Sequence, residues 1–187
     1  MATSLTTPPL TGDLVRVLID AEKIDKRVEE LAQQINKDYK DVKTPLVLVG
    51  VLKGSFIFLS DLVRKLTIPH LVEFIAISSY GSAGDVQGTV RMLMDTREDL
   101  AGHDVLIVED ILDSGNTLSY LIKNIKARNV NSVKTAVFLD KPDRHIVPVE
   151  IAYMGFPIPD VWVVGYGLDY KEKYRTLPYI AEMKPQL

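Results

Sequence analysis

A short apolar run that ends in two carboxylates constrains this chain more than any other stretch. Residues 105–108 are all aliphatic and predict a buried parallel strand, with Glu109 and Asp110 at its end. The small polar residues 113–117 then form a turn that opens a helix. Backbone N–H groups and the dipole at a helix start favour an anion, and carboxylates accept hydrogen bonds from sugar hydroxyls. The stretch therefore predicts a sugar-phosphate site at the carboxyl ends of the strands.

The apolar segments on either side of this stretch predict an α/β protein, with a mainly parallel twisted sheet flanked by helices. We expect strands near residues 13–19, 46–52, 70–78, 90–94, 132–139, 149–154 and 161–164, and helices near 20–39, 56–66 and 117–129. Residues 79–88 hold three glycines between two of these strands. Such a segment can be a mobile lid or a plain hairpin connection, and a long hairpin can serve as both.

The composition limits the kinds of partner, chemistry and cellular location that the chain can have. The 187 residues suit one domain, and a net charge of −3 argues against a nucleic-acid partner. The absence of cysteine excludes disulfides, thiolate catalysis and cysteine-based zinc sites, and it fits a cytoplasmic location. The first ten residues do not read as a signal peptide, and the longest apolar run, 46–52, is too short to span a membrane. We expect no membrane partner.

The sequence lacks the motifs of several common nucleotide-binding and catalytic sites. The central turn has neither the spacing of a P-loop nor a G-x-G-x-x-G pattern, and no nucleophile elbow is present. The three histidines lack ligand spacing. Lys53, Gly54 and Ser55 follow the apolar run 46–52 and precede a helix, so they form a second place where N–H groups and a lysine can face an anion. An ordinary surface lysine is the alternative interpretation.

Four blocks in order carry a family resemblance. They are residues 50–54, residues 79–81, the central stretch 108–117, and residues 163–170 with Arg175 beyond. The central block is similar to the phosphoribosyl pyrophosphate (PRPP) motif of type I phosphoribosyltransferases. The chain from about Val15 to Leu177 resembles the hypoxanthine-guanine phosphoribosyltransferases, and Lys141 together with the block 163–170 narrows the resemblance to these 6-oxopurine enzymes. The resemblance implies a single domain over residues 1–187, with a core of about 40–145 and a small hood from about 1–20 and 146–187.

The resemblance also implies which residues bind PRPP. The 5′-phosphate would lie among Asp113, Ser114, Gly115, Asn116 and Thr117, and Glu109 and Asp110 would face the ribose hydroxyls, directly or through Mg²⁺. Pyrophosphate would be bound by Leu52, Lys53, Gly54, Ser79, Tyr80 and Arg175, with Ser79 and Tyr80 on a closing lid. In this family the peptide between Leu52 and Lys53 can be cis.

The purine half follows from the same resemblance. Lys141 would donate to the 6-oxo group, Trp162 would stack on the ring, and Val163 and Asp169 would lie at its edge. Asp169 would hold a second Mg²⁺ beside the pair at Glu109 and Asp110. The implied reaction transfers 5-phosphoribosyl to N9 of hypoxanthine or guanine and gives IMP or GMP, with Asp113 accepting a proton at N7. The family implies a homodimer or homotetramer, with the helix after Gly54 as a contact face.

Simpler roles remain open for single residues. Asp113 can cap a helix, Trp162 can be a core aromatic, Lys141 can be a surface turn residue, and Asp169 can be a turn acid. Two other functions also remain open. One is a PRPP-sensing regulator of the same fold, which would be expected to carry a basic face or an added DNA-binding segment. The other is an enzyme that prefers xanthine or a pyrimidine.

Overall fold

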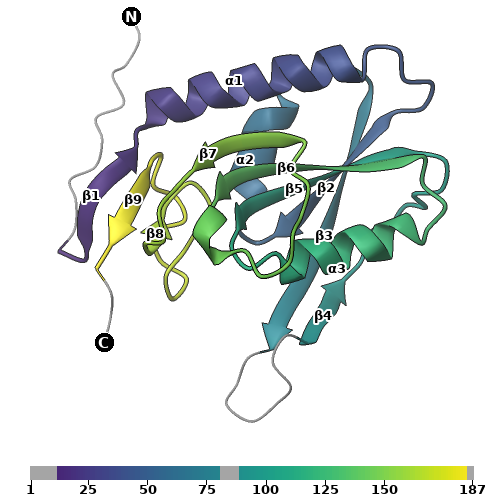
Figure 1. The fold of residues 1–187 in the computed structure, drawn as a ribbon. Coiled ribbons are helices and arrows are strands. Elements are labelled where there is room, and N and C mark those ends of the chain that lie inside the picture. The colour runs from purple at the N-terminus through teal and green to yellow at the C-terminus, as the bar shows by residue number, and fades with distance from the viewer. Residues whose placement is uncertain (1–11, 81–88, 185–187) are drawn as a thin grey trace, which may run out of the picture.

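A six-stranded sheet forms the centre of the protein (Figure 1). The computed structural model describes residues 12–80 and 89–184. Neighbouring strands are parallel except for the antiparallel pair at one edge. In spatial order, the strands are β4 (Thr89–Met94), β3 (His70–Tyr80), β2 (Leu46–Leu52), β5 (Asp104–Leu112), β6 (Ser132–Asp140) and β7 (Tyr153–Pro157).

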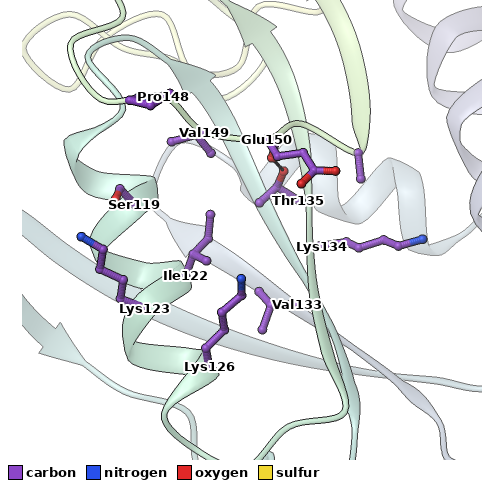
Figure 2. A pocket seen from close by; sticks show the side chains of 11 residues that line it. Ser119, Ile122, Lys123, Lys126, Val133, Lys134, Thr135, Pro148, Val149 and Glu150 are labelled. Carbon is purple, nitrogen blue, oxygen red and sulfur yellow. Dashed lines mark hydrogen bonds between the residues drawn. The ribbon is translucent and has the colours of Figure 1, made fainter.

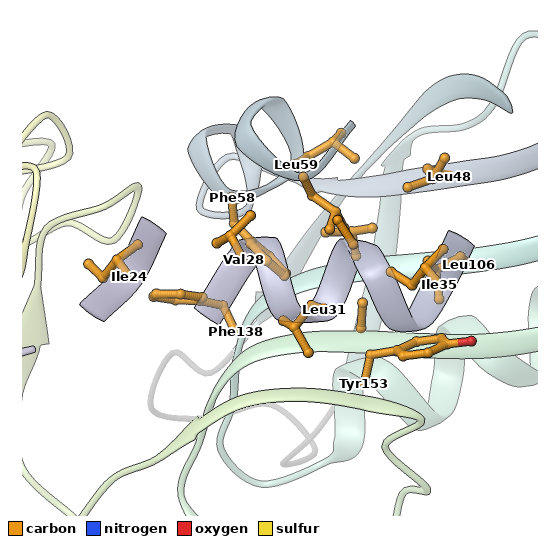
Figure 3. Close-up of a cluster of buried hydrophobic side chains, with 14 of the residues drawn as sticks. Ile24, Val28, Leu31, Ile35, Leu48, Phe58, Leu59, Leu106, Phe138 and Tyr153 are labelled. Carbon is orange, nitrogen blue, oxygen red and sulfur yellow. The ribbon is translucent and has the colours of Figure 1, made fainter. Parts of the chain in front are cut away.

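Helices cover both faces of this sheet, which explains the continuous apolar strands. On one face, α1 (Ala21–Asp38) and α2 (Phe56–Val63) pack against Leu48, Leu106 and Phe138 (Figure 3). On the other face, α3 (Asn116–Lys126) packs against the alternate residues Val105 and Ile107. No helix in the described part of the chain is long and apolar enough to cross a membrane.

A second, three-stranded antiparallel sheet forms the hood. Its order is β1 (Leu14–Ile19), β9 (Ile180–Met183) and β8 (Val163–Val164), so the two ends of the described chain meet in it. The predicted limits of the hood need one correction, because β7 pairs with β6 in the main sheet although it lies beyond residue 145. Strand β9 was not predicted from the sequence.

The structure confirms most predicted elements and shifts the ends of several. Strand β3 and strand β4 form the expected hairpin, whose connecting residues 81–88 lie outside the described residues. Helix α2 ends at Val63, three residues earlier than expected. Strand β7 starts at Tyr153 rather than at Val149, because Val149 and Ile151 pack on the α3 side of the core before the chain joins the sheet.

The start of α1 offers a direct test of a local sequence signal. Asp20 precedes the helix in an extended conformation, and its Oδ1 accepts a hydrogen bond of 2.9 Å from the Lys23 N–H. Replacing Asp20 with Ala should lower the free energy of unfolding by about 1 kcal/mol, because that N–H loses its partner. Urea denaturation would measure the loss. Asp41→Ala, at an exposed carboxylate that caps no helix, should change stability less, and equal losses would contradict the capping role.

Candidate active site

The end of β5 places two acidic residues, Glu109 and Asp110, side by side. Glu109 is buried, and its Oε2 has no hydrogen-bond partner among the described residues. Burial raises the pKa of Glu109, and the neighbouring Asp110 raises it further. Burial also raises the pKa of Asp110, although a hydrogen bond with Glu109 opposes this effect. The pair therefore tends to keep a proton. Hydroxyl donors or a cation bound to the pair would take the place of that proton.

This pair should make the stability of the free protein depend on pH. Folding raises the pKa of Glu109 above its ordinary value of 4.5, so the folded state keeps a proton that the unfolded chain releases. The corresponding stability is present below that value and is lost as pH rises through the raised pKa. Glu109→Gln should flatten the decline, and its gain in Tm over the wild type should be larger at about pH 8 than at about pH 4. Exposed Glu98→Gln serves as the control, and an equal slope in both variants would contradict the prediction.

The turn before α3 has the shape of an anion cradle. Gly115 occupies the N-cap position at φ 85°, and Ser119 N donates to its carbonyl over 2.9 Å. A hollow of about 100 Å³ is lined by Glu109, Asp113, Ser114, Gly115 and Thr117 together with neighbouring apolar residues. The Ser114 carbonyl accepts from the N–H groups of residues 146 and 147, which fixes the outer side of the turn. The predicted phosphate loop, residues 113–117, is therefore held in shape by a distant segment.

Asp113 does not cap α3, so that simpler interpretation is wrong. The N-cap residue is Gly115, and no side chain caps the helix. The Asp113 carboxylate instead accepts a hydrogen bond of 3.0 Å from Arg144 Nε, and both side chains are about half exposed. Asp113 is thus available to a ligand above the loop.

The segment after β2 lies directly against the acidic pair. The peptide between Leu52 and Lys53 is cis. A Cβ atom built on Gly54 would lie 1.5 Å from Asp110 Oδ2, and one built on Gly167 would lie 1.9 Å from the Gly54 carbonyl oxygen. Only glycine fits at either position. Three segments far apart in sequence therefore meet at Asp110.

Cations and acids from the C-terminal segment complete this side. The Arg175 guanidinium donates to Asp169 Oδ1 over 2.8 Å and to the Gly167 carbonyl over 2.9 Å. Glu172 bridges it to Lys53, with Lys53 Nζ 3.0 Å from Glu172 Oε1. Asp169 Oδ2 also accepts from the Glu172 N–H, so Asp169 does serve its turn. Lys53 and Arg175 are thus brought together as predicted, through an acid that the sequence did not single out.

The predicted purine residues lie beyond β6 and beside the hood. Lys141 is buried, and its N–H donates to the Leu112 carbonyl over 3.0 Å, so it is no surface turn residue. Trp162 has 64% of its surface exposed, so it is no core aromatic. The Trp162 carbonyl accepts from Met183 N, and Val163 begins β8. Ser79 and Tyr80 end β3, but their side chains lie outside the described part of the structure.

The carboxylates could bind a metal ion only if a bound ligand supplied further oxygen atoms. In residues 12–80 and 89–184, no group of three or more acidic, histidine or cysteine side chains could hold a metal ion. Glu109 and Asp110 form a pair with an unused oxygen, whereas Asp169 is joined to Arg175. Mg²⁺ commonly takes one or two carboxylates and completes its shell with water and substrate phosphates. The donor set fits that pattern.

One further hollow lies away from these residues. It measures about 330 Å³ and lies between α3, β6 and the segment before β7 (Figure 2). Ile122, Val133 and Val149 give it an apolar floor, with Lys123 and Lys126 on the α3 side. None of the predicted site residues lines it.

Comparison with known proteins decides the family. A model of the phosphoribosyl transferase domain matches residues 18–171. The chain belongs to the type I phosphoribosyltransferase family. A hypoxanthine-guanine phosphoribosyltransferase of Dictyostelium discoideum is 50% identical to this phosphoribosyltransferase over 173 residues, which cover 91% of this chain and 96% of the relative. A hypoxanthine phosphoribosyltransferase of Salmonella typhimurium is 47% identical, with 90% and 95% covered.

Solved structures agree with this assignment. A structure of the hypoxanthine phosphoribosyl transferase of Trypanosoma cruzi superposes with a TM-score of 0.89 at 44% identity, covering 95% of each chain. The predicted fold and family of this phosphoribosyltransferase are confirmed, and the chain is an enzyme. The roles predicted for single residues stay predictions.

Sequence reasoning missed three charged residues in this phosphoribosyltransferase. Arg144 contacts Asp113, Asp160 contacts Lys141, and Glu172 joins Lys53 to Arg175. Arg144 lies three residues after Lys141, and Asp160 lies two before Trp162. This closeness to predicted residues was the available signal, but surface charges beside a turn are usually solvated and carry no pattern.

Proposed function

We propose that this enzyme transfers the 5-phosphoribosyl group of PRPP to N9 of hypoxanthine or guanine, giving IMP or GMP and pyrophosphate. One observation carries the proposal. Lys141 is joined to Leu112 by a backbone hydrogen bond of 3.0 Å, immediately before the phosphate loop. A group that can read a 6-oxopurine and a loop that can hold a 5′-phosphate are therefore neighbours, as a reaction between the two substrates requires.

The phosphate and ribose would be held by the loop and the acidic pair. Backbone N–H groups and the hydroxyls of Ser114 and Thr117 would donate to the 5′-phosphate at the start of α3. Glu109 and Asp110 would accept from the ribose hydroxyls. The unused Glu109 Oε2 supports this role, because a buried acceptor without a donor is costly in the free protein.

Pyrophosphate would leave toward Lys53 and Arg175. Charge develops on the leaving group as the bond from C1′ breaks, and two fixed cations stabilise it more than they stabilise the intact substrate. Both cations contact Glu172, so an acidic group fits between them. The predicted lid with Ser79 and Tyr80 would exclude water from the activated sugar.

Magnesium is part of this proposal. Glu109 and Asp110 would hold one Mg²⁺ together with the ligand, and Asp169 would hold a second once Arg175 turns to the pyrophosphate. Bound Mg²⁺ would neutralise charge on the pyrophosphate. Asp169 and Arg175 are 2.8 Å apart, so a metal ion at Asp169 would lie near any pyrophosphate that Arg175 binds.

The purine would lie between Lys141 and Trp162. The Lys141 ammonium would donate to O6, the exposed Trp162 ring would stack on the base, and Val163 and Asp169 would contact its edge. Asp113 would accept the proton at N7 as N9 attacks C1′. The exposure of Trp162 beside the fixed strand β8 supports this role, because a free ring face is available for stacking.

A panel of bases tests the proposal. The purified enzyme would be assayed with PRPP and Mg²⁺ and, separately, with hypoxanthine, guanine, xanthine, adenine and uracil. We expect turnover with the first two and little with adenine, because Lys141 can donate to a 6-oxo group and not to a 6-amino group. We also expect little with uracil, because a pyrimidine has no imidazole ring with an N7 and an N9. Preference for xanthine would contradict the substrate assignment. Absence of turnover with all five would favour a PRPP-sensing regulator.

We also propose that the enzyme is a homodimer or homotetramer in the cytoplasm. Helix α2 leaves Phe56 40% exposed, and β3 leaves Val72 and Phe74 similarly exposed. An apolar area of this kind is typical of a subunit contact. The lack of cysteine supports a reducing compartment. Light scattering coupled to gel filtration would measure the assembly, and a monomer at micromolar concentration would contradict it.

A further inference from the structure

Arg144 contacts the carboxylate of Asp113. Its Nε donates to Asp113 Oδ1 over 3.0 Å. Among the residues that the structure describes, Asp113 Oδ2 has no hydrogen-bond partner, and the carboxylate plays no part in capping α3. The contact therefore engages one oxygen of Asp113 and leaves the other to a ligand.

Arg144 and Lys141 come from a single turn and share an acid. The Arg144 N–H donates to the Lys141 carbonyl over 3.0 Å in the short helix Pro142–Arg144. Asp160 lies between the two side chains, with Oδ1 3.4 Å from Lys141 Nζ and Oδ2 3.8 Å from Arg144 Nη1. The order Asp113, Arg144, Asp160, Lys141 is thus an unbroken chain of alternating charge.

This chain of charge joins the two groups that the proposed reaction uses on the purine. We propose that Arg144 is a positioning residue for Asp113 and that Asp160 fixes Arg144 and Lys141 together. The proton acceptor at N7 and the donor to O6 are then held at a set separation along one edge of the base, on which N7 and O6 are neighbours. The inference rests on the proposed function, because Asp113 and Lys141 have these roles only if the base is a 6-oxopurine.

Stability alone does not account for this arrangement. Asp113, Arg144 and Asp160 have side chains that are 43%, 52% and 50% exposed. Ion pairs between such exposed groups contribute little to the free energy of folding. Orientation of a reacting group, in contrast, strongly affects the rate of a bound reaction. Loss of Arg144 should therefore reduce catalysis more than it reduces stability.

The test is a double-mutant cycle between Arg144 and Asp113. Arg144→Gln should lower kcat with hypoxanthine by about tenfold and leave KM for PRPP within about twofold, because the reacting carboxylate loses its orientation while the loop 113–117 is unchanged. Arg144→Lys should recover part of the loss, since the charge remains. In the Asp113→Asn background, Arg144→Gln should cause much less than this tenfold loss, because its main route to catalysis is already removed.

The control is Arg128→Gln, which breaks an ion pair of 2.7 Å with Asp95 outside the proposed site and should leave kcat unchanged. Independent, multiplying losses in the Arg144→Gln, Asp113→Asn double variant would overturn the inference, as would wild-type kcat in Arg144→Gln. If Arg144→Gln does not fold, Arg144→Lys in the same cycle gives the answer. Failure of the proposed function is separate, because it would show as absent turnover in the wild-type enzyme.

Discussion

Replacing Asp113 with Asn should lower kcat with hypoxanthine by about 10²-fold or more, which is the usual size of a lost general-base contribution. Asn has nearly the shape of Asp, so it can still accept the Arg144 hydrogen bond and leave the phosphate loop in place. PRPP binding should therefore survive. Steady-state kinetics would give kcat, and titration calorimetry would give the affinity for PRPP.

The matched control for this substitution is Asp143→Asn. Asp143 lies one residue before Arg144 in the same short helix and is exposed, so it carries a similar charge near the site without a contact to the loop. It should keep the kcat of the wild type. Full activity in Asp113→Asn would remove Asp113 from the role of base. Equal losses in both variants would point to a general charge effect.

Replacing Gly115 with Arg should abolish PRPP binding. Gly115 has a φ of 85°, and a Cβ atom built on it would lie 2.2 Å from the Val147 carbonyl oxygen. Any side chain must therefore strain the backbone and push the loop away from the segment that fixes it. A long cationic chain would in addition fill the hollow of about 100 Å³ where the phosphate is proposed to bind.

Gly102→Arg tests whether backbone strain at a positive φ is enough to abolish PRPP binding. Gly102 also has a positive φ, of 74°, but a Cβ atom there would meet nothing within 4 Å. That variant should lose some stability and keep PRPP binding. Calorimetry with PRPP and circular dichroism of both variants would measure binding and folding. Unaltered binding in Gly115→Arg would show that residues 113–117 are not the phosphate loop.

The sequence predicted the centre of the molecule well because burial leaves a clear pattern there. Strands β2 and β5 are covered on both faces, so all of β2 apart from Gly50 and the run 105–108 of β5 are aliphatic. The amphipathic helix α1 carries an equally clear signal, since Ile24, Val28 and Leu31 recur on one face. Strand β9 has only four residues and includes Glu182, which pairs with Arg16, so neither length nor alternation marks it.

Sequence patterns can mark positions where the backbone demands a residue type, but not places where long side chains meet. Gly54, which belongs to the predicted pyrophosphate segment, stands where any larger residue would collide with Asp110. The contact of Arg144 with Asp113 spans 31 residues and depends on how two loops approach one another. Neither residue type nor spacing encodes such a contact, so it emerges only from the folded chain.

The central place of β9 in the hood affects the order in which parts of the enzyme can fold during synthesis. In that sheet, β9 is the only neighbour of β1 and also the only neighbour of β8, which follows Trp162. The phosphate loop needs segments only up to Val147 for its described contacts, whereas the hood waits for residues 180–183. On the ribosome, the turn that is proposed to bind the 5′-phosphate can therefore take shape early, while the proposed purine wall forms only when the last strand is released.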